Sequence, residues 1–166
     1  MATIALCEDN SFQREMMEEL LNEYSSTNHS VSVTAFETSR ELLEHVKKNG
    51  GFDIYILDIV MPGINGMELA STLRMMKDEG SIIFTTASME YAVASYDVKA
   101  FYYMVKPIDS HRLFRILDEL FLKLKPREST MTVRTKDGDV DLRLRDILYV
   151  EVVDRAMKFH LSDGVT

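Results

Sequence analysis

The strongest constraint on the fold of this chain is the alternation of short apolar runs with helical patterns over residues 1–125. Each run is rich in Ile, Val, Phe or Tyr, as strands are. Strands that alternate with helices are typical of a parallel sheet that is covered by helices on both faces. The sequence therefore predicts a doubly wound α/β domain. Its expected strands are Thr3 to Cys7, Val31 to Phe36, Asp53 to Leu57, Ser81 to Thr85 and Ala100 to Val105.

Residues that favour the start of a helix lie in the gaps between the predicted strands. We expect Ser11 to cap the first helix, and Thr38 with Glu41 has the spacing of a capping box for the second. The last helix is predicted over His111 to Leu124, and Pro126 cannot continue it. Apolar residues at helical spacing are Phe12, Met16, Leu20 and Leu21 in the first helix and Leu113, Ile116, Leu117, Leu120 and Leu124 in the last.

The pattern changes after this helix to short strands separated by Asp-Gly turns and polar links. We expect a first domain over residues 1–125, a linker over 126–130 and an all-β segment over 131–166. So short a segment rarely builds a core of its own, and we interpret it as part of an incomplete second domain. The strands expected here are Thr132 to Thr135, Val140 to Leu142, Ile147 to Val152 and Met157 to Leu161.

Composition narrows the class of protein. A hydrophobic content of 46% with 28% charged residues is typical of a globular chain, and no run is apolar for long enough to span a membrane. The first residues lack a signal-peptide pattern, so the expected location is the cytoplasm. A net charge of −8 argues against a basic surface that grips nucleic acid throughout. The single cysteine, Cys7, lies in an apolar strand and is interpreted as a buried, inert thiol.

Several predicted strands end in residues that carry chemistry. Glu8 and Asp9 follow the first strand, Asp58 follows the third, and Lys106 follows the fifth. Ligands of open parallel sheets bind outside the carboxyl ends of the strands, so these groups should converge. Clustered carboxylates favour Mg²⁺, and a lysine could pair with Asp58 at rest and with phosphoryl oxygens later. Asp58 is then a candidate nucleophile for phosphoryl transfer, with the Thr86 hydroxyl as a donor to the transferred group.

These residues, together with Met61-Pro62, Gly66, Ala87 and Pro107, resemble the receiver domain of two-component response regulators over residues 1 to about 125. The resemblance implies a flavodoxin-like sheet with the strand order 2-1-3-4-5. It also implies that Asp58 accepts a phosphoryl group from a sensor histidine kinase, and that the protein is a regulator and not an enzyme. Asp9, Asp58 and the backbone carbonyl of Val60 would coordinate Mg²⁺, with Glu8 often acting through water. Lys106 and Thr86 would bind the phosphoryl group, and the Lys106–Pro107 peptide would be cis.

The same resemblance suggests a switch. Tyr103 is either an ordinary half-buried strand residue or the aromatic group that turns inward when Thr86 moves toward the phosphoryl group. In the second case, the segment from Tyr91 to Val105 and the last helix would be biased toward forming a homodimer. Val60 and Ser88 would flank the path of the hydrolytic water, and an apolar Val60 predicts slow loss of the phosphoryl group.

The stretch from Arg145 to Arg155, followed by Met157 to His160, resembles the start of the LytTR DNA-binding domain. This resemblance implies transcriptional control, with promoter DNA bound by the complete domain. Most base-contacting residues of that family would fall beyond Thr166, so none is assigned, and DNA binding by residues 1–166 alone is left open.

Two other functions compete with this interpretation. A phosphatase of the haloacid dehalogenase type also places a nucleophilic acid at a strand end, but it needs a second acid two residues later, where this chain has Val60. The other rival is a receiver that acts as a protein-interaction module without binding DNA. Taken singly, Glu8 and Asp9 could be helix caps, Asp58 a turn former and Lys106 a solvated charge.

Overall fold

The computed structural model describes residues 2–27, 31–87, 97–124, 130–135, 138–143, 147–153 and 156–162. The chain divides into two compact units, Met1–Leu124 and Lys125–Thr166. The first unit holds the parallel sheet and its helices, and the second holds antiparallel hairpins.

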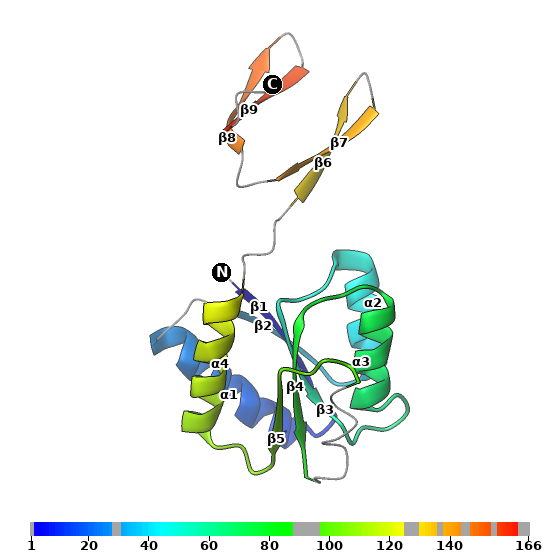
Figure 1. The fold of residues 1–166 in the computed structure, drawn as a ribbon, viewed down its shortest axis with the longest axis vertical. Coiled ribbons are helices and arrows are strands. Elements are labelled where there is room, and N and C mark those ends of the chain that lie inside the picture. Colours follow the sequence, from blue (N-terminus) through cyan, green and yellow to red (C-terminus); the bar gives the residue numbers. More distant parts are fainter. Residues whose placement is uncertain are drawn as a thin grey trace. The chain divides into compact units, whose positions relative to one another are not determined.

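The first unit is built on a five-stranded sheet with the order β2-β1-β3-β4-β5, in which all neighbouring strands run parallel (Figure 1). This confirms the predicted doubly wound, flavodoxin-like sheet. The last strand begins two residues later than predicted, because the chain turns at Lys99, whose φ is 52°. The strands are β1 (Ala2–Cys7), β2 (Val31–Phe36), β3 (Ile54–Asp58), β4 (Ser81–Thr86) and β5 (Tyr102–Val105).

Helices cover both faces of this sheet. Figure 1 shows α1 (Ser11–Thr27) and α4 (Ser110–Lys123) together on one face, and α2 (Ser39–Asn49) and α3 (Gly66–Met75) on the other. The helix predicted over His111 to Leu124 is α4. Its predicted apolar side is confirmed, since Leu113, Ile116, Leu117 and Leu120 are buried.

The sheet separates two apolar clusters because successive side chains of a strand point to opposite faces. In β3, Tyr55 and Leu57 pack with α2 and α3, whereas Ile54 and Ile56 pack with α1 and α4. Both faces of β3 are buried, as expected for a central parallel strand. This burial holds the carboxyl ends of the strands in a fixed arrangement.

The first helix differs from its prediction. Asn10, not Ser11, is its cap, because the Asn10 side chain accepts a hydrogen bond from the Gln13 N–H at 3.0 Å. Phe12 and Met16 are 69% and 49% exposed, so they lie outside the core. The face of α1 that packs on the sheet is rotated from them, and it carries the buried residues Met17, Leu21 and Tyr24.

The capping box predicted for α2 is half present. Thr38 accepts from the Glu41 N–H at 3.2 Å, but the Glu41 carboxylate accepts from the backbone of Glu37 and not from that of Thr38. A complete capping box occurs at α3 between Asn65 and Glu68.

The second unit contains two antiparallel hairpins. They are formed by β6 (Thr130–Thr135) with β7 (Gly138–Arg143) and by β8 (Ile147–Val153) with β9 (Ala156–Leu161). These strands confirm the predicted all-β character. In the second hairpin Val152 faces Met157, and these side chains are 75% and 68% exposed, so the hairpin buries little apolar surface by itself.

Some predicted features lie outside the described residues. They are residues 126–129 of the proposed linker, the segment that starts at Tyr91 as far as residue 96, Ser88, and parts of the Arg145 to Arg155 stretch. Thr130, placed in the linker by the prediction, begins β6. Among the described helices, none is both long enough and apolar enough to cross a membrane.

Candidate functional site

Three carboxylates meet where two strands end at the same edge of the sheet. Glu8 and Asp9 follow β1, and Asp58 is the last residue of the neighbouring strand β3. Each of these residues offers an oxygen within 4.8 Å of the others. The strand register explains why these oxygens are close. Cys7 of β1 pairs with Leu57 of β3, so the residues that follow them lie side by side at the end of the sheet.

Lys106 reaches this cluster from the end of β5. Its Nζ lies 2.7 Å from Glu8 Oε2 and 3.0 Å from Asp58 Oδ2, and it also donates to Gln13 Oε1. The lysine side chain is 17% exposed, whereas those of Glu8 and Asp58 are 4% and 7% exposed. Opposite charges in so sheltered a place interact more strongly than they would in water.

The surroundings of Glu8 shift the pKa of its carboxyl group upward. Burial raises its pKa above the ordinary value, its hydrogen bond from Lys106 lowers it in part, and the charge of Asp58 raises it again. Its backbone N–H donates to the Phe36 carbonyl at 3.2 Å, and its Oε1 accepts from the Asn10 N–H at 3.4 Å. The side chain is therefore held toward the cluster by its backbone and by the start of α1.

The turn after Asp58 is tightly built. Asp58 Oδ1 accepts from the Val60 N–H at 3.2 Å, and the Gly66 N–H donates to the Ile59 carbonyl at 3.1 Å. A Cβ atom on Gly66 would lie 2.1 Å from the backbone oxygen of Asp58, a distance that side chains do not tolerate. Gly66 thus permits α3 to begin directly against the turn that carries Asp58.

The two predicted switch residues lie on neighbouring strands. Thr86 is fully buried at the end of β4, and its carbonyl accepts from the Lys106 N–H at 2.8 Å. Tyr103 on β5 is half-buried and packs against the cluster on the α2 and α3 face. Thr86 therefore borders Lys106, and the Tyr103 side chain lies on the face of the sheet that α2 and α3 cover.

Two further features of the site match the sequence expectations in position. Val60 is 60% exposed beside Asp58, and the Lys106–Pro107 peptide is cis.

Cys7 is buried, with its Sγ 3.7 Å from Met61 Sδ, and burial raises the pKa of its thiol to about 12. A thiol with so high a pKa stays protonated and is a poor nucleophile at neutral pH.

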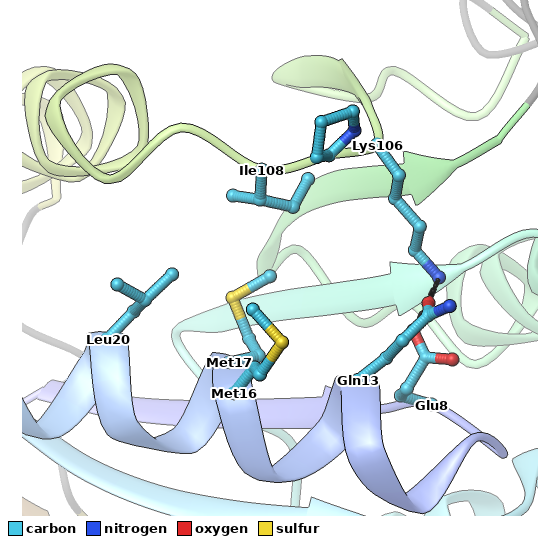
Figure 2. Close-up of a pocket in the computed structure, with 8 residues that line it drawn as sticks. Glu8, Gln13, Met16, Met17, Leu20, Lys106 and Ile108 are labelled. Atoms are coloured by element: carbon cyan, nitrogen blue, oxygen red, sulfur yellow. Dashed lines mark hydrogen bonds and ion pairs between the residues drawn. The ribbon is translucent and has the colours of Figure 1, made fainter.

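An apolar groove of about 350 Å³ opens beside the cluster between α1 and the loop that follows β5. Figure 2 shows Met16, Met17 and Leu20 rising from α1 toward Ile108, with Lys106 and Gln13 at one end of the groove. The site thus combines a charged pocket with an adjoining apolar surface.

Sequence reasoning missed Asn10 and Gln13. Asn10 bonds both the Gln13 N–H and Glu8, and the Gln13 side chain contacts Lys106. The spacing Asn-x-x-Gln directly after the acidic pair is a capping signal, and it could have shown that Asn10 caps α1. The contact between Gln13 and Lys106, which is more than ninety positions away, could not be read from local sequence.

Chemically, this donor set suits a hard divalent cation. Carboxylate oxygens are the ligands that Mg²⁺ prefers, and Glu8, Asp9 and Asp58 supply them at one point. A lysine that contacts two of these acids can also neutralise an incoming anion. The arrangement can therefore hold a cation and an anionic group next to the Asp58 carboxylate.

Comparison with known proteins gives matches over the same region. The sequence profile of the response regulator receiver domain matches residues 4–118. The chemotaxis protein CheY4 of Vibrio cholerae has a similar structure, with a TM-score of 0.63 and 26% identity. That match covers 72% of this chain and 98% of CheY4.

Longer relatives extend the similarity toward the C-terminus. Sensory transduction protein LytT of Bacillus anthracis is 32% identical over an alignment of 130 positions, which covers 69% of this chain and 52% of that protein. Accessory gene regulator protein A of Staphylococcus epidermidis is 33% identical over 161 residues, covering 89% of this chain and 68% of that protein. These relatives support the LytTR-type interpretation of the second unit. The chain spans about half the length of LytT.

Proposed function

The chain belongs to the response regulator receiver family, and we propose that it accepts a phosphoryl group on Asp58 from a sensor histidine kinase. It is a two-component response regulator with relatives that regulate transcription. The observation that carries the proposal is the position of Lys106 Nζ between Asp58 and Glu8.

In the proposed reaction, an Asp58 carboxylate oxygen attacks phosphorus in line with the leaving group. The P–N bond of the kinase phosphohistidine breaks as the new P–O bond forms, and its electron pair leaves with the imidazole nitrogen. Asp58 Oδ2 accepts from Lys106, and Oδ1 accepts from the Val60 N–H. As the carboxylate becomes an acyl phosphate, Lys106 exchanges its bond with Asp58 for one with a phosphoryl oxygen. Thr86 donates its hydroxyl to another phosphoryl oxygen.

Glu8, Asp9 and Asp58 would hold Mg²⁺, together with the backbone carbonyl of Val60. When bound, the ion neutralises charge that develops on the phosphoryl oxygens. The close approach of the three acids supports this assignment, because Lys106 balances only part of their charge.

We propose that phosphorylation draws Thr86 toward the phosphoryl group and lets Tyr103 turn inward. Thr86 is buried and shares a backbone hydrogen bond with Lys106, so a movement of either residue is transmitted to the end of β5. The surface formed by β5, α4 and the preceding segment would then favour a homodimer. The charge added at Asp58 would thus shift this surface from its resting arrangement toward the one that dimerises.

The kinase is expected to approach over the groove beside Lys106. Phe12 and Met16 are exposed on α1, and the groove extends from Met16 to Ile108. Exposed apolar side chains around a charged pocket are typical of a surface that binds another protein. The cytoplasm remains the proposed location of this encounter.

The output is proposed to be LytTR-type binding of promoter DNA by the complete second domain. Dimerisation would place two such domains on one site and raise affinity through effective concentration. The competing proposal is a receiver that regulates a protein partner. Binding of promoter fragments by the full-length protein would favour the DNA-binding proposal. This binding should weaken as the salt concentration rises, because contacts to DNA phosphates release counterions.

Intact-mass measurement after incubation with acetyl phosphate tests the phosphoacceptor directly. We expect the wild type to gain the mass of one phosphoryl group when Mg²⁺ is present and little without it. Asp58→Asn should gain none, because an amide is not a nucleophile at this centre. Glu44→Gln, which changes an exposed acid on α2, should behave as the wild type.

The same samples also test the proposed switch. Size-exclusion chromatography should show dimer formation for phosphorylated wild type and not for Asp58→Asn. A phosphorylated wild type that stays monomeric would contradict the dimer proposal. Rapid, continuous release of phosphate without accumulation of the modified protein would instead favour a phosphatase.

A further inference from the structure

The start of α1 is tied to the acidic cluster by two residues that the proposed reaction does not use, Asn10 through its backbone N–H and Gln13 through its side chain. Asn10 caps the helix by accepting from the Gln13 N–H at 3.0 Å, while its own N–H donates to Glu8 Oε1 at 3.4 Å. This cap fixes the backbone of Gln13 next to Glu8. The Gln13 amide oxygen then accepts from Lys106 Nζ, as Figure 2 shows.

In two other helices that begin with a similar cap, the side chain of the third residue after the cap has a different partner. In α3, Glu68 is the third residue after its cap, and its carboxylate accepts from the Asn65 N–H at 3.1 Å. In α2, Glu41 bonds the backbone of Glu37 at 3.2 Å. Both carboxylates therefore satisfy backbone groups at the helix start. Gln13 occupies the same position in α1, but its side chain contacts Lys106 instead.

The contact completes the hydrogen bonding of Lys106. An ammonium group has three protons, and here the acceptors are Glu8 Oε2, Asp58 Oδ2 and Gln13 Oε1. The two acids pull the ammonium into the cluster, and the amide meets it from the side of α1 and the groove. A neutral amide orients the lysine without adding a further negative charge to the cluster.

We infer that Gln13 is a positioning residue for Lys106, which keeps the ammonium directed across the cluster toward Asp58. This inference rests on the proposed phosphorylation of Asp58 for its consequence, but not for the contact itself. Without the amide oxygen, one ammonium proton turns to water and the lysine samples other rotamers. Phosphoryl transfer should then slow by about threefold, the effect of one net hydrogen bond.

The test compares Gln13→Met with Gln13→Glu in the full chain. Methionine keeps the length of the side chain and removes the acceptor, whereas glutamate keeps an acceptor oxygen. Asn22→Ala, an exposed amide further along α1, is the control. The first readout is the ¹H–¹⁵N signal of the Lys106 ammonium, which is sharp only when its protons are hydrogen-bonded and exchange slowly. The second is the rate of phosphorylation by acetyl phosphate with Mg²⁺.

We expect Gln13→Met to broaden the ammonium signal and to lower the rate about threefold. Gln13→Glu should keep the signal, and Asn22→Ala should match the wild type in both readouts. An unchanged signal or an unchanged rate in Gln13→Met would overturn the inference. If the wild type is not phosphorylated at all, the proposed function fails, and the ammonium signal still decides whether Gln13 orients Lys106.

Discussion

Glu8 Oε2 and Lys106 Nζ lie 2.7 Å apart, although 98 positions separate the two residues in the chain. Both side chains are largely buried, so the pair links the end of β1 to the end of β5 in a sheltered environment. Breaking such a pair leaves an uncompensated buried charge, which costs more than the pair itself contributes.

Lys106→Met is therefore expected to lower the free energy of unfolding by about 3 kcal/mol at neutral pH. Glu8 and Asp58 would then repel each other without a cation between them. Urea denaturation in the absence of Mg²⁺ measures the change. Lys123→Met is the matched control, since its pair with Glu119 is exposed, and it should cost less than about 0.5 kcal/mol. Equal effects of the two substitutions would contradict the buried-pair interpretation.

The stabilisation by Mg²⁺ should depend on pH through Glu8. Burial raises the pKa of Glu8 in the folded protein above its unfolded value, so the folded state binds more protons between these two values. Without metal, the contribution of Glu8 to the unfolding free energy is present below that window and is lost as pH rises through it. Metal binding requires the ionised acids, so the rise in Tm caused by Mg²⁺ should be larger at about pH 7.5 than at about pH 5.

Calorimetric scans with and without Mg²⁺ at both pH values provide this measurement. In Glu8→Gln the residue no longer titrates, and the difference between the two pH values should shrink. A wild-type Tm shift that grows as the pH falls would rule out this role for Glu8.

Gly66→Ala is expected to destabilise the protein by about 2 kcal/mol, because its Cβ would lie 2.1 Å from the Asp58 backbone oxygen and the turn must move. The same movement should slow phosphorylation of Asp58. Gly63→Asn is the control, since a Cβ there meets open space and asparagine tolerates its φ of 77°. Thermal unfolding and the acetyl phosphate assay together test both effects, and a fully active Gly66→Ala would count against them.

Val60 is expected to prolong the phosphorylated state. It is 60% exposed beside Asp58, and an apolar side chain gives no polar help to a hydrolytic water. Val60→Asn should shorten the half-life of the phosphorylated protein several-fold while leaving the Tm nearly unchanged. Ile64→Asn in the same loop should leave the half-life unchanged. The half-life is measured by intact mass after removal of the phosphodonor, and a longer half-life in Val60→Asn would refute the expectation.

Much of the fold could be predicted from periodicity. The strand from Val31 to Phe36 has the predicted bounds, and the buried side of α4 carries the predicted leucines and Ile116. Errors arose at element ends, where local signals compete. Asn10 and Ser11 are both good caps, and only the backbone of α1 decides between them. Phe12 fits the helical spacing but is exposed, because the orientation of a helix depends on its packing.

Which side chains gather at the site followed from the sequence alone, since short apolar strands that end in acids and a lysine place these groups at the carboxyl edge of a parallel sheet. Strand periodicity and helix signals are local, so they can be read along the chain. That Lys106 contacts Glu8 as well as Asp58, and that Gln13 on α1 contacts the same ammonium, became visible in the folded chain alone. These contacts depend on the strand register and on the placement of α1 against the sheet, which arise from packing between segments far apart in sequence.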